Sequence, residues 1–374
     1  MPSQPTGEPA GPPHRSPTLP MTPIIWTDPV RQQRFAAWLL SLQASHGVQA
    51  ETARAAEVDA HISTDADTGM HRYLRVDSQR GGGFIVLDAP PDTPAWRTVI
   101  ETSNSVADGD LKLPGVLVAN DADGFALLED LGSPSFLQAL LQASTPEVDR
   151  LMRAATQALI QWQLKVDASR LPAFDESLQR RELQLFDQWC VQTEFARQWS
   201  AQELAWWEHS CKVLAANFAA QPQLAVHRNF VPRSLVLCEG GTGVLDFQDA
   251  RRGPISYDLA SLLRGAHISW DEERELDWAI RYWEQARRAG LPVGEDFGEL
   301  WRQIEWAGLQ RHLMTLGLLC RLKQREGMPV EEQEIARHFA YATKVATRYI
   351  ELSPLVRLLE SLQGSLVQTG FTLR

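Results

Sequence analysis

The sequence predicts an α+β fold of two lobes, an N-terminal lobe built on an antiparallel sheet and a larger helical C-terminal lobe. Two observations support this prediction. Before Gly132, short apolar runs rich in β-branched and aromatic residues alternate with Gly and Asp/Gly turns, a pattern typical of strands joined by tight turns. After Gly132, apolar residues follow helical spacing and tryptophan becomes frequent. We therefore assign residues 1–22 to an extension, 23–132 to the sheet lobe and 133–374 to the helical lobe.

The composition narrows the classes of function. The chain has 374 residues, more than one hydrophobic core usually holds, and 44% of them are hydrophobic, as in a soluble globular protein. A net charge of −11 without a long basic run argues against a nucleic acid or an anionic membrane as partner. The chain has no apolar run of the roughly 18 residues that span a bilayer and no signal-peptide core after Met1. We expect a cytoplasmic protein, and the sequence identifies no protein partner.

The cysteines support the same compartment. They lie far apart and form neither a CxxC pair nor a cluster with histidine: Cys190, Cys211, Cys238 and Cys320. We therefore expect buried free thiols in a reducing environment and no structural zinc.

Each element of the sheet lobe has a signal of its own. Residues 1–22 are rich in proline and cannot bury a core, so we expect a disordered extension, within which Met21 is an alternative start. Apolar residues at helical spacing predict a helix over 24–46. The runs YLRV (73–76) and FIVLDA (84–89), separated by three glycines, predict two strands, and residues 115–132 predict two more around an Asp/Gly turn.

The helical lobe has one clear helix start and one interruption. Ser144 to Glu147 combine a capping residue, a proline in the first turn and a glutamate three residues after the cap. Strand signals occur only between about Leu235 and Asp246, where a Gly-rich turn over 239–243 predicts a hairpin. A sheet lobe followed by a helical lobe with one small hairpin is the layout of a protein kinase.

The residues around this hairpin have the spacing of a phosphoryl-transfer site. His227 and Asn229 lie on a loop, Ser234 comes five residues after Asn229, and Asp246 follows the hairpin. Phosphoryl transfer needs a residue that orients or deprotonates the acceptor hydroxyl, ligands for Mg²⁺ and positive groups on the phosphates. The loop can supply the first of these, and Ser234 and Asp246 can supply the metal ligands.

This segment resembles the HxDxxxxN loop and the DFQD segment of aminoglycoside phosphotransferase-like kinases. It is similar, more narrowly, to bacterial N-acetylmuramate/N-acetylglucosamine anomeric kinases of cell-wall recycling. Further stretches with this similarity span most of residues 24–325: HRYLRV (71–76), VLDAPPD (86–92), FALLEDLG (125–132), LPAFDESLQRRELQLFDQW (171–189), DFQDARRGPISYDLASLLR (246–264) and GLQRHLMTLGLLCRL (308–322). The resemblance implies a protein-kinase-like two-lobe fold and an ATP-dependent phosphotransferase that uses Mg²⁺ and acts on an amino sugar.

The chain departs from this family at two positions. The catalytic aspartate of the family falls at Asn229, whose amide cannot accept a proton as a carboxylate does. The second metal ligand, an asparagine in the family, falls at Ser234, whose hydroxyl can ligate Mg²⁺ on a shorter side chain. Loss of the base need not abolish transfer, because kinase catalysis consists mostly of positioning and electrostatics. The two changes leave open whether the chain is an active enzyme.

The resemblance gives each loop residue an expected role. Asp246 is expected to hold Mg²⁺ with help from Ser234. Asn229, beside His227, is expected to orient the acceptor hydroxyl. The catalytic base is then solvent, a substrate phosphate or Asp249, which lies three residues after Asp246.

The nucleotide site is less clearly marked. The chain contains neither a Walker A motif nor GxGxxG. The resemblance places the phosphate-covering turn at residues 68–72. The second strand carries no lysine, which leaves Arg72 and Arg75 as cations for the phosphates or as ordinary surface charges. Glu129 to Leu131 resemble the hinge, whose backbone would pair with an adenine edge.

The acceptor site and the helix after the DFQD segment are also assigned by resemblance. Asp175 and Glu176 are expected to contact the sugar, as is Arg311, although a charged side chain within an apolar helix pattern is often an internal brace. Asp258 either braces the catalytic loop or is an ordinary acidic residue at a helix N-terminus.

Three functions remain open at this point. The first is an amino-sugar kinase with an altered catalytic loop. The second is a pseudokinase that binds nucleotide or sugar and acts as a regulatory or interaction protein, which Asn229 and Ser234 favour over a fully active enzyme. The third is a kinase for another small molecule, such as an aminoglycoside or an amino alcohol. The DFQD segment and the QRHL helix favour the sugar-kinase ancestry over this third function.

Overall fold

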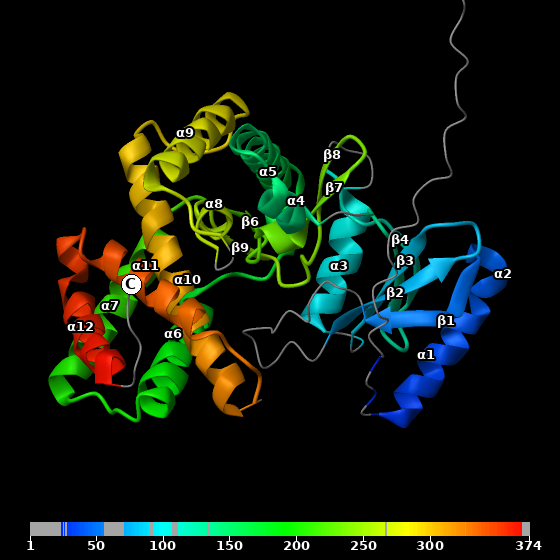
Figure 1. Cartoon of the computed structure of the whole chain (residues 1–374). Coiled ribbons are helices and arrows are strands. Elements are labelled where there is room, and N and C mark those ends of the chain that lie inside the picture. Colours follow the sequence, from blue (N-terminus) through cyan, green and yellow to red (C-terminus); the bar gives the residue numbers. More distant parts are fainter. Residues whose placement is uncertain are drawn as a thin grey trace, which may run out of the picture.

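The computed structural model describes residues 24, 26, 28–55, 71–89, 91, 93–106, 111–132, 135–265, 268–325 and 327–368. Within these ranges an N-terminal antiparallel sheet is followed by a mostly helical lobe, as predicted (Figure 1). The extension expected over 1–22 lies outside the described residues, as do positions 68–70 of the expected phosphate-covering turn.

The sheet has five strands in the order β1-β2-β3-β5-β4, and all neighbours are antiparallel. Four of these strands were predicted. The edge strand β1 was not, because its sequence VQAETARA is mostly polar and lacks the apolar alternation of its neighbours. The strands are β1 (Val48–Ala55), β2 (Arg72–Ser78), β3 (Gly83–Asp88), β4 (Val116–Asn120) and β5 (Phe125–Glu129).

The two faces of the sheet pack against different parts of the molecule. Leu74 and Val86 join one core with α1 (Pro29–Ser41), while Leu87 joins a second core with α3 (Pro94–Ser105) and the helical lobe. Figure 1 shows α3 between the sheet and the helical lobe. Because side chains alternate along a strand, odd-numbered residues of β2 face the helical lobe and even-numbered ones face α1.

The first helical region is shorter than predicted. Asp28 accepts a hydrogen bond from the backbone N–H of Val30 (2.8 Å), and Pro29 occupies the first helical position, so the helix begins there and not at residue 24. It ends at Ser41 and a short helix, α2 (Gln43–His46), follows it.

The helical lobe contains two packing regions, of which the first is the core already described between the sheet and α3. Helices α5, α8 and α9 share a core with α3, and a separate core joins α6, α7, α10, α11 and α12. The predicted capping box at the start of α5 is present, with Glu147 accepting from the N–H of Ser144 at 2.9 Å. The helices are α4 (Phe136–Gln142), α5 (Thr145–Lys165), α6 (Glu176–Leu185), α7 (Ala201–Ala219), α8 (Tyr257–Leu263), α9 (Glu272–Arg288), α10 (Phe297–Arg325), α11 (Glu332–Ala346) and α12 (Ser353–Gln368), with 3₁₀ turns η1 (Ala168–Arg170), η3 (Pro232–Ser234) and η4 (Ile350–Leu352).

A π-helical segment, η2 (Phe186–Glu194), continues α6 and crosses α10 at close range. The crossing point is Gly317 of α10. A Cβ at this position would lie 2.2 Å from the carbonyl carbon of Leu185 and 2.4 Å from the nitrogen of Phe186, closer than any real contact. Glycine is therefore needed there for the two backbones to approach each other.

Two small ribbons interrupt the helices and carry the catalytic loop. The predicted hairpin consists of β7 (Leu235–Cys238) and β8 (Gly241–Val244). The expectation that strands occur only there was wrong, because β6 (Gln223–Val226) pairs with β9 (Arg251–Pro254) on either side of it. Each of these strands has four residues, and Gly253 and Pro254 gave β9 a turn-like sequence.

The remaining expectations concern the cysteines and the membrane. All four cysteines are free, three are buried, and Cys238 is half-buried. Among the described helices, none combines the length and the apolar composition needed to cross a bilayer.

Candidate active site

The predicted catalytic loop, residues 227–234, connects β6 to β7. A buried carboxylate holds this loop. Asp258, near the start of α8, accepts hydrogen bonds from the backbone N–H groups of His227 (2.6 Å) and Arg228 (2.9 Å). Burial raises the pKa of Asp258 to about 7, although these two hydrogen bonds act in the opposite direction. Of the two roles left open for Asp258, the structure shows the brace.

His227 is also a positioning residue in this structure. The backbone N–H of Asn229 donates to Nδ1 (3.2 Å), so the other ring nitrogen carries the proton and donates to the carbonyl of Leu245 (2.7 Å). The ring is buried against Trp162 and Phe230. We expected His227 to act in catalysis, but its contacts show that it fixes the loop from the interior.

Arg311 of α10 contacts the backbone of the catalytic loop. Its guanidinium donates to the backbone carbonyl of Arg228 and stacks over the ring of Tyr257, 5.1 Å from the centroid. The Arg228 side chain in turn forms a buried ion pair with Glu182, which also accepts from Gln310. Of the two roles left open for Arg311, these contacts show the brace of the catalytic loop, and its contact with the sugar stays a prediction.

The three residues that the sequence spacing connected do meet. The Nδ2 amide of Asn229 donates to Oδ2 of Asp246 (2.7 Å) and lies 3.2 Å from Oγ of Ser234. The hydroxyl of Ser234 lies 3.5 Å from the same carboxylate oxygen. Asp246 has a left-handed backbone, with φ of 64°, which is costly for a residue other than glycine and is often found at functional sites.

The donors around Asp246 fit a magnesium ion that keeps several waters and takes further ligands from phosphates. Asp246 supplies a carboxylate and Ser234 a hydroxyl, and a half-turn of the Asn229 amide would present its oxygen in place of its nitrogen. No group of three or more His, Cys, Asp or Glu side chains that could hold a metal occurs among the described residues.

Two residues that we did not predict extend this cluster. The Gln248 amide donates to Oδ1 of Asp246 (2.6 Å), and the hydroxyl of Tyr73 on β2 donates to Oε1 of Gln248 (2.7 Å). These bonds connect the sheet lobe to the Asp246 carboxylate. Burial raises the pKa of Tyr73 well above its usual value, and the charges of Asp246 and Asp249 raise it further. The alternation of side chains along β2 could have placed Tyr73 on the face toward the helical lobe, but we did not apply it to this residue.

Asp249 lies close to this cluster. Its side chain is buried, and its backbone carbonyl accepts a long hydrogen bond from Arg228 (3.5 Å). The charge of Asp249 raises the pKa of both Tyr73 and Arg228, so its carboxylate is near both side chains. Asp249 stays a predicted catalytic residue.

The two arginines proposed for the nucleotide phosphates lie on opposite faces of the sheet. Arg72 faces α1, where its Nε donates to the buried Asp88 (2.7 Å) and its guanidinium stacks 4.0 Å from the Trp26 ring centroid. This placement does not support a phosphate-binding role for Arg72, because Tyr73, on the other face, is the side chain that reaches the Asp246 cluster. Arg75 does face the helical lobe and forms an ion pair with Asp130 (2.9 Å).

The hinge candidates lie where the two lobes join. Glu129 ends β5, and its carboxylate accepts from the backbone N–H of Gly115 (3.1 Å). The Leu131 side chain approaches Gly243 of β8 so closely that a Cβ there would be 2.8 Å from it. The pairing of this backbone with an adenine stays a prediction.

Asp175 and Glu176 line a cavity of about 740 Å³ together with Phe174, Lys212 and Arg252. Both acids have structural contacts, since Asp175 caps α6 by accepting from the N–H of Leu178 (2.9 Å) and Glu176 pairs with Arg180 (3.0 Å). The residues that line this cavity do not include Asn229, Ser234 or Asp246. The structure thus brings the two acids together, but in a different cavity from the catalytic loop.

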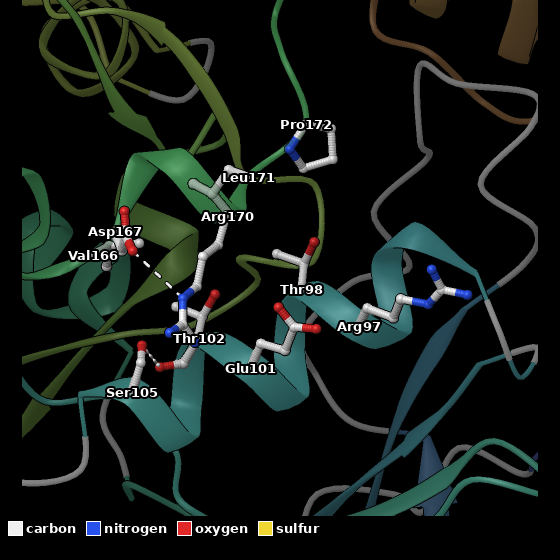
Figure 2. Close-up of a pocket in the computed structure, with 10 residues that line it drawn as sticks. All are labelled: Arg97, Thr98, Glu101, Thr102, Ser105, Val166, Asp167, Arg170, Leu171 and Pro172. Atoms are coloured by element: carbon white, nitrogen blue, oxygen red, sulfur yellow. Dashed lines mark hydrogen bonds and ion pairs between the residues drawn. The ribbon is translucent and has the colours of Figure 1, made fainter.

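A second cavity, of about 310 Å³, lies between α3 and the segment that follows α5 (Figure 2). Arg170 extends from η1 toward α3 and pairs with Asp167 (3.4 Å), while Thr98 and Thr102 of α3 are buried at the other wall. None of the predicted site residues lines this cavity.

Comparisons with known proteins agree with this geometry. The model of a phosphotransferase enzyme family matches residues 65–297. An N-acetylmuramate/N-acetylglucosamine kinase from Neisseria meningitidis serogroup B is 41% identical over 309 residues, which cover 82% of this chain and 92% of that protein. A protein of the same name from Pseudomonas aeruginosa is 37% identical, over 81% of this chain and 89% of its own length.

Solved structures share the fold at low sequence identity. An amicoumacin kinase in complex with AMP-PNP, Ca²⁺ and Ami matches with a TM-score of 0.57 and 11% identity, covering 86% of this chain and 96% of that one. The gentamicin complex of APH(2")-IIa matches with a TM-score of 0.55 and 14% identity, covering 88% and 99%. From the family match and the identity to the curated kinases together, this chain belongs to the aminoglycoside phosphotransferase-like family of phosphotransferase enzymes.

Proposed function

We propose that this protein is an ATP-dependent sugar kinase that phosphorylates the anomeric hydroxyl of N-acetylmuramate or N-acetylglucosamine during peptidoglycan recycling. The observation that carries the proposal is the 41% identity to the Neisseria kinase named for these sugars, over 92% of that protein. The meeting of Asp246, Ser234 and Asn229 at one point of the catalytic loop supports a phosphoryl-transfer site. The AMP-PNP and Ca²⁺ bound to the amicoumacin kinase support a nucleotide and a divalent cation.

In this proposal Asp246 and Ser234 would hold Mg²⁺, which supplies positive charge to the phosphates when bound. Asn229 orients the sugar hydroxyl. The proton of that hydroxyl goes to Asp249, to solvent or to a phosphate oxygen. The distances of 2.7 and 3.2 Å from the Asn229 amide to Asp246 and Ser234 support this arrangement.

The lobes divide the remaining tasks. Residues 23–132 would bind the nucleotide through Arg75 and the backbone of Glu129 to Leu131, and residues 133–374 would supply the catalytic loop and the acceptor site. Asp175 and Glu176 stay the proposed acceptor contacts. We expect the protein to act in the cytoplasm, without a nucleic acid or a membrane as partner.

A transfer assay tests the proposal. Labelled ATP is offered with N-acetylmuramate and with N-acetylglucosamine to the native protein and to the Asp246→Ala, Asn229→Asp and Ser234→Asn variants. Turnover by the native protein that Asp246→Ala abolishes would establish a kinase that works without a carboxylate at 229. If neither the native protein nor the variants with a restored family residue transfers phosphate to either sugar, the sugar-kinase proposal fails.

A pseudokinase is the second candidate, and one observation favours it. The amide of Asn229 donates to Oδ2 of Asp246 and provides no base. Under this alternative, the native protein binds nucleotide or sugar, transfers no phosphate, and gains activity only in Asn229→Asp or in the double variant with Ser234→Asn.

A further inference from the structure

His71 immediately precedes β2 and is buried without a hydrogen bond. Its side chain is 7% exposed, and among the described residues neither ring nitrogen has a hydrogen-bond partner. A buried polar group without a partner costs stability, and such groups are few in native proteins. An imidazole ring without a hydrogen bond at this position points to a ligand that accepts one from it.

The ring lies on the face of β2 that looks toward the catalytic loop. His71 and Tyr73 are two residues apart, so strand alternation places them on one face, and their rings are in edge contact at 6.4 Å. The Tyr73 hydroxyl reaches Gln248, which is bonded to Asp246. His71 is therefore the next side chain along the same face from Tyr73, which contacts the Asp246 cluster through Gln248.

Neither arginine of β2 supplies a hydrogen-bond donor for a phosphate at the end of the strand where His71 lies. Arg72 is paired with Asp88 on the opposite face, and Arg75 is paired with Asp130 at the hinge end. The nucleotide triphosphate carries several negative oxygens, and N–H donors to such oxygens form strong hydrogen bonds.

We propose that His71 donates a ring N–H to a phosphate oxygen of a bound nucleoside triphosphate, beside Asp246. The inference rests on the proposed nucleotide-dependent function, and it adds a phosphate-contacting residue that the arginines were expected to provide. No bond is made or broken at His71: the residue orients the phosphate and holds no proton of the reaction.

Two substitutions separate a donor from a packing residue. His71→Gln keeps an N–H donor at a similar reach, whereas His71→Phe keeps the ring and removes both nitrogens. His209→Phe, at an exposed position of α7, is the matched control for the same change of side chain. The measurement is calorimetric binding of Mg²⁺ with a non-hydrolysable ATP analogue, and of adenosine alone, to the full chain.

The expected result is selective. His71→Phe weakens binding of the triphosphate about tenfold or more, leaves adenosine unchanged, and raises the melting temperature of the free protein, because it removes two unpaired buried nitrogens. His71→Gln keeps most of the triphosphate affinity, and His209→Phe changes nothing. A structural role for His71 would instead lower the melting temperature of the free protein.

Two outcomes overturn the proposal. Either His71→Phe binds the triphosphate as the native protein does, or His71→Gln loses as much affinity as His71→Phe, which would mean that the N–H donor is not what matters. Failure of the proposed sugar kinase looks different, because binding of the triphosphate without transfer to a sugar leaves the His71 experiment fully readable.

Discussion

At the scale of single residues, the site is governed by one carboxylate and the donors around it. Asp246 accepts hydrogen bonds from the amides of Asn229 and Gln248 on its two oxygens, at 2.7 and 2.6 Å. An aspartate at 229 would replace one of these donors by a second negative charge. The amide therefore makes the loop stable without a metal, at the expense of a base.

Asn229→Asp is expected to destabilise the metal-free protein by about 1–3 kcal/mol, the scale of one or two pKa units, because two carboxylates then lie about 3 Å apart. Mg²⁺ with ADP should recover this loss, so the rise in melting temperature on adding them will be larger in Asn229→Asp than in the native protein. Thermal unfolding with and without Mg²⁺ and ADP measures both effects. The double variant Asn229→Asp with Asp246→Asn, which restores one amide, is the control; an equal rise in all three proteins would contradict the expectation.

Asp258 predicts how stability depends on pH. Burial raises the pKa of Asp258 in the folded state to about 7. Between the lower pKa of the unfolded chain and this value, the folded state keeps a proton on Asp258 that the unfolded chain has released. The contribution of Asp258 is fully present at low pH and is lost as the pH rises from about 4 to about 7. The free energy of unfolding of the native protein should fall relative to that of Asp258→Asn across this window, with a constant difference above it. Parallel curves from denaturant titrations at several pH values would show the opposite.

Sequence reasoning found some of these residues and misplaced others, for identifiable reasons. Asn229, Ser234 and Asp246 could be predicted because the loop and hairpin fix their spacing. Arg72 could not be placed correctly, because the face of a strand that meets the active site depends on which elements cover each face. The bond from Arg311 to the carbonyl of Arg228 could not be predicted either, because it joins two helical-lobe segments 83 residues apart.

At the scale of elements, α10 and η2 cross at close range in the helical lobe. The π-helical turn and Gly317 belong together, since any side chain at 317 would meet the backbone of Leu185 and Phe186. Helix periodicity predicted α10 but not this crossing. The short strands β6 and β9 escaped prediction for a related reason: their identity comes from pairing with each other and not from their own sequences.

Gly317→Ala is expected to cost about 1–3 kcal/mol or more through overpacking, since backbone atoms cannot move aside as a side chain can. Gly308→Ala, in the same helix, is the matched control: the atoms nearest its Cβ would be side-chain atoms, the Cδ of Arg264 at 3.2 Å and the Cβ of Ala260 at 4.0 Å. That change should cost less than Gly317→Ala, because Arg264 has to shift by only a few tenths of an ångström and alanine gains helix propensity of up to about 1 kcal/mol. Chemical denaturation of both variants measures the difference, and equal effects would argue against the close crossing.

At the scale of the whole molecule, the two lobes are connected through the active site itself. Tyr73 of the sheet lobe donates to Gln248, which donates to Asp246. The layout of a sheet lobe and a helical lobe could be read from residue periodicity on each side of Gly132. This connection could not, because it joins residues 175 positions apart through a contact that only the folded lobes create.

Tyr73→Phe should lower the free energy of unfolding by about 0.5–1.5 kcal/mol, the net contribution of one hydrogen bond, and more if the Gln248 oxygen stays buried without a donor. Tyr341→Phe is the matched control, because its hydroxyl bonds to Ser269 at an exposed position. It should change stability by less than about 0.5 kcal/mol. Denaturant unfolding followed by tryptophan fluorescence makes the comparison, and a neutral Tyr73→Phe would mean that the contact between the lobes contributes nothing to stability.

The pair of arginines on Asp88 limits how far the chain can be shortened. Asp88 is 3% exposed, and Arg31 of α1 donates to it alongside Arg72. A fragment that begins at Met21 retains Trp26 and Arg31, so a protease that trims the first 20 residues leaves this arrangement intact. A fragment that begins after α1 would lack Arg31, so only Arg72 would compensate the charge of the buried Asp88. It would also expose the apolar face of the sheet that Phe35 and Leu39 cover. Limited proteolysis should therefore stop short of α1 while the sheet lobe remains folded.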